Sequence, residues 1–266
     1  MRKLLFIFTL ICLSGCVIKI ETPRKHQQDL HKDAKTISDL SYCDDCGYIG
    51  TVYIMENEKY VPYLVLTDDY QGSSLLLREQ LLEEKVVYNT GYEEYPSYYA
   101  GSIIDQYLYD TFSQCFSSEL YDAILDEPIE ITDKSSFSRG QETIETVPRK
   151  VFLLSYAELN NTAFQTKAKE GPLLEYFADH ANRIAYRPDG KADSWWLRTP
   201  TTSDRFHATS VDPEGVSGSA GVLGLGEAIA NGVRPAFRLP KQISVQPMDG
   251  SGGEFYTLVL SKDLRE

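Results

Sequence analysis

The alternation of hydrophobic and polar positions divides the chain into three parts. Near its start, three runs rich in Val, Ile, Leu and Tyr (GYIGTVYIM, KYVPYLVLTDD and SSLLLRE) predict β-strands. In the middle, apolar residues recur at helical spacing and predict two helices, which begin near Ser102 and Ser118. Asp105 follows Ser102 by three residues, as in a capping box. After Gly190, short strand-like pieces alternate with Gly, Ser, Asp and Pro.

Between these parts, PIEITD and KVFLLS predict two more strands, separated by a polar loop over residues 133–147. Short helical turns are expected in SYAELN and in GPLLEYFADHANRIA. Strands first, helices next and strands last predict an α+β fold with a few short helices. Its C-terminal part is expected to be a loop-rich antiparallel β region.

The first sixteen residues, MRKLLFIFTLICLSGC, have the layout of an export signal. Arg2 and Lys3 precede an apolar run that is too short to remain as a membrane-spanning helix. The segment Leu-Ser-Gly-Cys that ends at Cys16 resembles the bacterial lipobox, which implies cleavage before Cys16 and diacylation of its sulfur. Two acyl chains anchor a protein stably. The alternative is an ordinary signal peptide that happens to end in cysteine.

These features predict three regions: a signal peptide over residues 1–15, a polar tether over 16–40, and one globular domain over 41–266. The domain is expected at the extracytoplasmic face of the cell membrane, held there through the lipid. The chain has 26 basic and 39 acidic residues, for a net charge of -13. Loss of Arg2 and Lys3 with the signal makes the charge -15. So acidic a surface repels nucleic acid, which excludes nucleic acid as a partner.

Cys43 and Cys46 form a C-x-x-C pair, which has three interpretations. Half of a zinc site would need two more ligands, and no second C-x-x-C or C-x-x-H exists. A redox pair normally opens a helix, whereas Gly47 leads into a strand-like run. A local disulfide, or a pair of reduced thiols, is the interpretation that we favour, and no metal is expected. Cys115 is expected to be a buried apolar residue.

The runs WWLRTP and NGVRPAFRL resemble the closing signature of a bacterial domain of unknown function, number six-two-seven-three. Other runs match that family in order, and the resemblance covers about residues 48–240. The family is similar in turn to C-type-lectin-like and formylglycine-generating folds, which implies a C-type-lectin-like arrangement. Trp195 and Trp196 are expected in the core, and Gly232 suits a backbone constraint. Arg198 and Arg234 are expected to find carboxylate or carbonyl partners.

Motifs that carry catalysis are missing from the sequence. It contains no H-E-x-x-H, no G-x-S-x-G and no phosphate-binding G-x-x-x-x-G-K-[ST]. Formylglycine-generating relatives hold copper through two late cysteines, but this chain has none after Cys115, so neither that activity nor a cofactor is expected. We therefore predict a non-catalytic module that binds a cell-wall or host glycan or an envelope protein. Its candidate site is the loop stretch between the signature strands, with Asp204, Arg205, Phe206, His207, Asp212 and Glu214.

Two other functions stay open. One is a hydrolase or transferase that acts on envelope polymers through Glu93, Glu94, Asp212 and Glu214. Oxygen atoms of Asp212 and Glu214 would also suit calcium, although their spacing matches no known calcium loop. The other is a structural or adhesion component, suggested by the tyrosine-rich segment from Tyr88 to Tyr99. Tyrosine among Gly and Ser makes adaptable contact surfaces.

Overall fold

The computed structural model describes residues 33–91, 93–139, 142–159, 168–201, 204–224, 227–248 and 255–260. The predicted signal, the lipid-bearing Cys16 and most of the predicted tether lie outside these residues. The fold is mostly β (40%), and the few short helices that the sequence predicts are present. Among the residues described, no helix is both long and apolar enough to cross a membrane.

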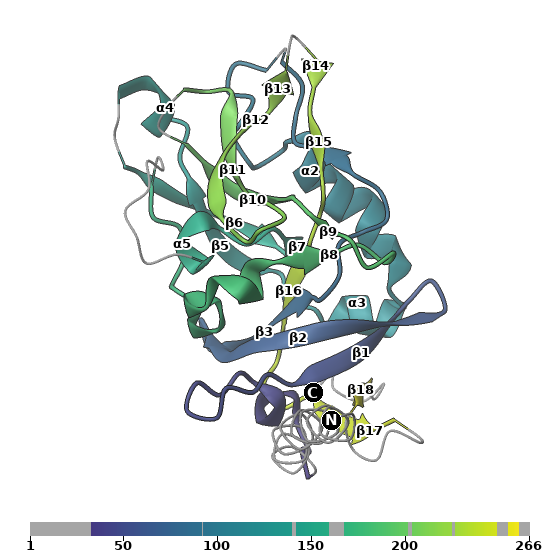
Figure 1. Cartoon of the computed structure of the whole chain (residues 1–266). Helices are drawn as coiled ribbons and strands as arrows, with labels where there is room; N and C mark the ends of the chain where they lie inside the picture. Colours follow the sequence, from purple (N-terminus) through teal and green to yellow (C-terminus); the bar gives the residue numbers. More distant parts are fainter. Residues whose placement is uncertain are drawn as a thin grey trace, which may run out of the picture.

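A seven-stranded sheet forms the main layer, in the order β17-β18-β1-β2-β3-β16-β7 (Figure 1). The strands β1, β2 and β3 are the three hydrophobic runs near the start of the domain, and each is antiparallel to the next. The parallel pairing of β18 with β1 makes the sheet mixed. The strand bounds are Thr51–Glu56 (β1), Lys59–Tyr70 (β2), Ser73–Arg78 (β3), Val151–Phe152 (β7), Ala236–Leu239 (β16), Ser244–Pro247 (β17) and Tyr256–Val259 (β18).

The two predicted helices are present. The first begins at Ser102, whose Oγ accepts a hydrogen bond from the Asp105 amide at 3.3 Å. It passes from the α-helix α2 (Ile103–Gln106) to the π-helical turn η2 (Tyr107–Thr111) and then to the 3-10 helix η3 (Phe112–Cys115). The second helix, α3 (Ser118–Ala123), is capped by the Ser117 hydroxyl. Most of the apolar side chains that repeat at helical spacing are buried in the core or packed against it, which is why the pattern identifies the helices.

Antiparallel ladders make up the rest, in agreement with the texture of the sequence after Gly190. A three-stranded sheet contains β10 (Trp195–Pro200), β11 (His207–Val211) and β12 (Ser217–Gly221). Eight more strands pair in four short antiparallel ladders. They are β5 (Glu127–Thr132) with β6 (Ile144–Arg149), β4 (Val86–Val87) with β15 (Ala230–Asn231), β8 (Ala185–Tyr186) with β9 (Ala192–Asp193), and β13 (Leu223–Gly224) with β14 (Glu227–Ala228).

Two sequence-based predictions were wrong. The loop expected over residues 133–147 contains α4 (Ser136–Arg139) and most of β6. β6 alternates between exposed and half-buried positions, so its polar residues conceal the strand. The tether predicted to end at residue 40 includes η1 (Ile37–Leu40), whose Ile37 and Leu40 are fully buried in the core. Four residues are too few to produce a helical period, and the globular structure therefore starts before residue 41.

The two signature strands lie against each other in the core. Trp195 and Trp196 are fully buried, and their indole nitrogens donate to the carbonyls of Arg183 and Val86 at 3.1 and 3.0 Å. A Cβ at Gly232 would lie 2.5 Å from the Ser194 carbonyl oxygen. The backbone constraint expected at Gly232 is thus the close approach of the Ser194 backbone.

Candidate functional site

Two segments that the sequence singles out separately meet in the structure. Ser97 donates from its amide and its hydroxyl to the Arg205 carbonyl, at 3.1 and 2.9 Å. The Arg205 guanidinium donates in turn to the Glu94 carbonyl at 3.2 Å. The tyrosine-rich segment therefore packs on the turn before β11. We name the surface formed by residues 93–99, 134–137 and 204–207 the loop cluster.

The loop cluster carries half-buried aromatic rings beside charged groups. The ring centroids of Tyr95 and Phe137 are 5.1 Å apart, and the ammonium group of Lys134 lies 4.6 Å from the centre of the Tyr98 ring. The Arg205 guanidinium lies 4.9 Å from the centre of the Phe206 ring. Large rings with a polar edge supply contact area at a low cost in conformational entropy. Such a surface suits recognition of a ligand.

Asp204 and His207 form a carboxylate–imidazole pair within the loop cluster. Asp204 Oδ1 is 2.8 Å from His207 Nδ1 and accepts a hydrogen bond from the Phe206 amide at 2.6 Å. The two side chains are 42% and 38% exposed, so a ligand can reach them. A carboxylate on Nδ1 orients the ring and leaves Nε2 as the nitrogen that can meet a ligand.

The other two predicted site residues lie elsewhere. Asp212 follows the far end of β11, and its Oδ1 accepts from the amides of Glu214 and Val216 at 3.0 and 2.8 Å. This carboxylate stabilises the turn between β11 and β12. The five-residue strand separates the turn from Asp204 and His207 by roughly 16 Å at 3.3 Å per residue. The four acidic residues of the enzyme hypothesis are therefore not brought together. Within the described ranges no group of three His, Cys, Asp or Glu could hold a metal.

The sequence predicts a partner for Arg198 but does not identify the buried charge network around it. Its guanidinium donates from Nη1 and Nη2 to the two carboxylate oxygens of Glu158, at 2.9 and 2.8 Å, and neither side chain is exposed. Nη1 also donates to the Leu153 carbonyl, and Nε to that of Glu130. Helix α5 (Tyr156–Leu159) positions Glu158. A glutamate among apolar residues in SYAEL gives no sign of its partner, because the partner is distant in sequence.

A second carboxylate completes this network. Glu170 is 3.4 Å from Arg198 Nε and accepts from the Thr132 amide and the Thr199 hydroxyl, both at 2.8 Å. Burial raises the pKa of Glu170, although the Arg198 charge opposes the shift. The Tyr70 hydroxyl donates to Glu158. These side chains are almost completely buried, and their donors and acceptors are used within the network and by nearby backbone groups. We therefore assign the network to the scaffold.

The other signature arginine is bonded differently. Arg234 is 2% exposed and donates from Nε to the Arg78 carbonyl at 3.0 Å. Its guanidinium lies 5.3 Å from the centre of the Trp195 ring. Nη1 is buried without a hydrogen-bond acceptor among the residues described. The expectation that both signature arginines find acceptors is met in full at Arg198 and only in part at Arg234.

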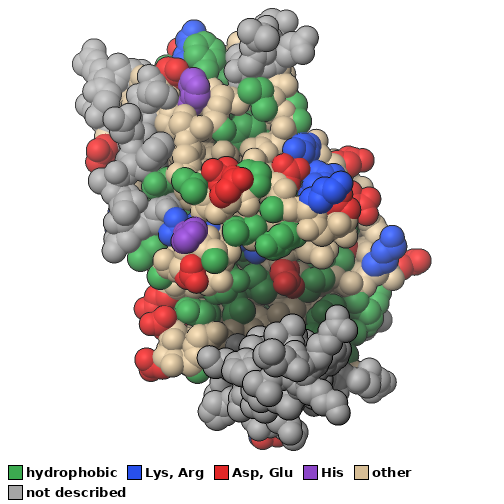
Figure 2. Space-filling model, in the orientation of Figure 1, with side chains coloured by type: hydrophobic (Ala, Val, Ile, Leu, Met, Phe, Trp, Pro, Cys, Tyr) green, Lys and Arg blue, Asp and Glu red, His purple; other side chains and the backbone are tan. Residues whose placement is uncertain are grey.

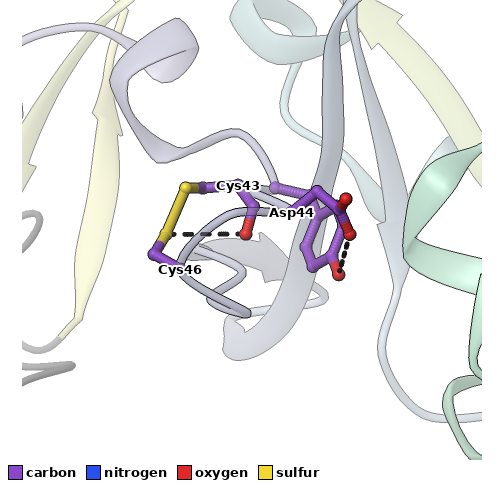
Figure 3. The surroundings of a disulfide bond; sticks show 4 residues. Cys43, Asp44 and Cys46 are labelled. Carbon is purple, nitrogen blue, oxygen red and sulfur yellow. Dashed lines mark hydrogen bonds between the residues drawn. A yellow bond between two sulfur atoms is a disulfide. The ribbon is translucent and has the colours of Figure 1, made fainter.

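Cys43 and Cys46 are joined in a disulfide (Figure 3). The pair closes a small turn that the backbone bridge between Cys43 and Tyr48 also holds. This is a local cross-link in the segment that leads into β1. Burial raises the pKa of the half-buried Cys115 thiol to about 12, so the thiol is protonated at neutral pH.

Figure 2 shows hydrophobic side chains gathered across the middle of one face of the molecule, with acidic side chains among them. Figure 1 also gives the two ends of the domain. The strands β17 and β18 and the first described residues lie at one end, and α4, β13 and β14 lie at the other. The Lys35 carbonyl accepts from the Val245 amide at 2.9 Å, so the described chain begins against β17.

The fold and the loop cluster define a mostly β domain whose loops carry an aromatic, charged surface. A family model described as Domain of unknown function (DUF6273) matches residues 71–241, and the chain belongs to this family. The match runs from the β2–β3 turn past β16 and includes both signature strands. No curated protein matches the chain, and no solved structure matches it.

Proposed function

We propose that this protein is a non-catalytic binding module, held at the extracytoplasmic face of the cell membrane by lipid on Cys16. The observation that carries the proposal is the packing of the tyrosine-rich segment on the turn at residues 204–207. Two segments far apart in sequence thereby supply one exposed recognition surface. Loops on a rigid scaffold commonly carry binding sites.

The two ends of the domain support this arrangement. The first described residues lie beside β17 at one end of the domain. Helix α4 lies at the opposite end and contributes Phe137 to the loop cluster (Figure 1). A tether that enters beside β17 would hold the loop cluster away from the membrane. A ligand in the envelope or outside the cell would then have free access.

We also propose that the arrangement is C-type-lectin-like. The pairing of the two signature strands supports this idea, through the parallel bridge between Trp195 and Gly232. The antiparallel β10–β11–β12 sheet that follows the first signature strand supports it further.

The side chains of the loop cluster suit a polar ligand with flat or apolar faces. Arg205 and Lys134 supply donors, Asp204 supplies an acceptor, and Tyr95 and Phe206 supply rings. A glycan of the cell wall or of a host fits this chemistry, and so does a loop of an envelope protein.

The test is crosslinking in intact cells with the triple variant Arg205→Ala, Phe206→Ala, His207→Ala. The full-length protein is expected to give a specific adduct with an envelope protein or glycan, and the triple variant is expected to lose it. The matched control is Lys59→Ala, Tyr60→Ala, because these exposed residues lie on β2, outside the loop cluster. An adduct that persists in the triple variant would refute the proposed site, provided that the melting temperatures agree.

A further inference from the structure

A second group of residues gathers on one face of the seven-stranded sheet. Tyr53 on β1, Glu79 directly after β3 and Arg234 just before β16 all point to this face. The reason is that paired residues of neighbouring strands share a side, as do residues two apart in one strand. Three backbone pairs connect these residues across the sheet: Tyr53 with Pro62, Leu64 with Leu77, and Leu77 with Ala236. Glu79 lies two residues after Leu77, and Arg234 lies two residues before Ala236.

Aromatic side chains cover this face. Tyr176, on η4 (Glu175–Ala178), packs edge-on against Tyr42 with ring centroids 5.4 Å apart. Tyr53 packs in the same manner against Phe255 at 5.1 Å. The Glu79 amide donates to the Pro62 carbonyl at 3.0 Å, and Pro62 pairs with Tyr53, so Tyr53 and Glu79 lie in one row across the sheet. Burial raises the pKa of Tyr53, and the Glu79 charge adds to the shift. We name Tyr42, Tyr53, Glu79, Tyr176 and Arg234 the sheet-face group.

Tyr176 connects the two charged members of the group. Burial raises its pKa, the Arg234 charge lowers it, and the Glu79 charge raises it again. The charges of Arg234 and Glu79 therefore act in opposite directions on the Tyr176 phenol. Tyr42 is near the surface, and its own pKa is raised by slight burial and by Asp44.

Among the described residues, Arg234 differs from the other buried arginines in having no carboxylate partner. Arg78, Arg198 and Arg238 each have one, at 3.0, 2.8 and 3.4 Å respectively. Arg234 donates to one carbonyl and has a buried Nη1 with no acceptor among the residues described. Burial lowers the pKa of Arg234 to about 10, so it stays charged at neutral pH. A buried charge with an unused donor is costly, and an oxygen atom from a ligand would reduce that cost.

We propose that the sheet-face group is a second binding site, which takes a neutral oligosaccharide. Tyrosine rings stack on the C–H faces of sugars, and sites of this kind combine aromatic walls with a few polar groups. Glu79 would accept hydrogen bonds from sugar hydroxyls, and Arg234 would donate to a sugar oxygen. An anionic ligand is disfavoured by Glu79 and by the net charge of -13. A cationic ligand is disfavoured by Arg234.

Isothermal titration of the full-length protein in detergent with chitohexaose and cellohexaose tests the proposal, with a hexamer of galacturonic acid as the anionic comparison. Saturable binding of at least one neutral hexamer is expected. Tyr53→Ala and Tyr176→Ala should each raise Kd at least about tenfold through loss of a stacking surface. Glu79→Gln should weaken binding of the neutral hexamer and strengthen binding of the acidic hexamer, because the substitution removes a negative charge.

Two variants keep the test independent of folding defects. Tyr53→Phe retains the ring, so its Kd should stay within about twofold of wild type. Tyr109→Ala removes a tyrosine that is 63% exposed on η2 and should leave Kd unchanged. Failure of both neutral hexamers to bind, or binding of the acidic hexamer alone, would overturn the proposal. The triple variant of the loop cluster should retain neutral-sugar affinity, and loss of affinity there would assign the sugar to the loop cluster instead.

Discussion

Arg198 and Glu158 form a bidentate ion pair in which neither side chain is exposed to solvent. The pair joins β10, which carries the first signature strand, to helix α5. Charges removed from water need partners for every donor and acceptor. The carbonyls of Glu130 and Leu153, the Ser155 amide and the Tyr70 hydroxyl supply them.

Removal of either charge should therefore be strongly destabilising. Arg198→Ala leaves two buried carboxylates without a counterion, and Glu158→Ala leaves the guanidinium without its bidentate partner. Each variant is expected to lose about 3–5 kcal/mol of unfolding free energy, measured by urea denaturation. Lys191→Ala is the control, because the pair between Lys191 and Asp189 is exposed and its loss should leave stability nearly unchanged. A loss at Arg198 as small as that at Lys191 would contradict the structural role.

Glu170 should make stability depend on pH. Burial raises its folded-state pKa above the ordinary value of 4.5, so the folded protein holds this proton more tightly than the unfolded chain. The stabilisation from this group is present at low pH and is lost as the pH rises from 4.5 through the folded-state pKa. Glu170→Gln cannot titrate and should lack this component. Urea denaturation of both proteins from about pH 4 to about pH 8 measures the difference, and parallel curves would contradict it.

Two glycines should respond differently to the same substitution. Gly232→Ala places a Cβ 2.5 Å from the Ser194 carbonyl, so the signature strands must separate. A loss of about 1–3 kcal/mol in stability is expected from overpacking. Gly218→Ala on β12 is the matched control, since nothing lies within 4 Å of its added Cβ. Thermal unfolding of both variants tests the prediction, which fails if Gly232→Ala is tolerated as well as Gly218→Ala.

The lipid anchor is predicted from the sequence, since Cys16 lies outside the described residues. Wild-type protein should be labelled by a clickable fatty acid and should partition into detergent. Cys16→Ser removes the sulfur that carries the lipid, so labelling should disappear and processing of the signal should be impaired. Cys115→Ser is the control, since Cys115 lies in η3 within the domain, and it should be labelled as wild type is. Unlabelled wild-type protein in the medium would exclude the anchor.

Some of this structure follows from short stretches of sequence. The strands β1, β2 and β3 and the helix start at Ser102 were predicted correctly, because strand-forming runs and caps depend on residues close together in the chain. The family was also predicted correctly, from two short signature strands. The β6 strand and the buried η1 helix were missed. Polar residues at the exposed and half-buried positions of β6 conceal that strand, and the burial of η1 depends on neighbours that no local pattern contains.

The sequence by itself determined the first three strands, the two central helices and the family, since each rests on residue types at short spacing. Only the tertiary structure decided which polar groups meet. Arg198 and Glu158 are 40 residues apart, and Ser97 and Arg205 are 108 apart. Two arginines in similar signature strands likewise differ, one surrounded by acceptors and one with an unused donor. Burial and pairing are properties of the packed chain, because segments distant in sequence supply the partners.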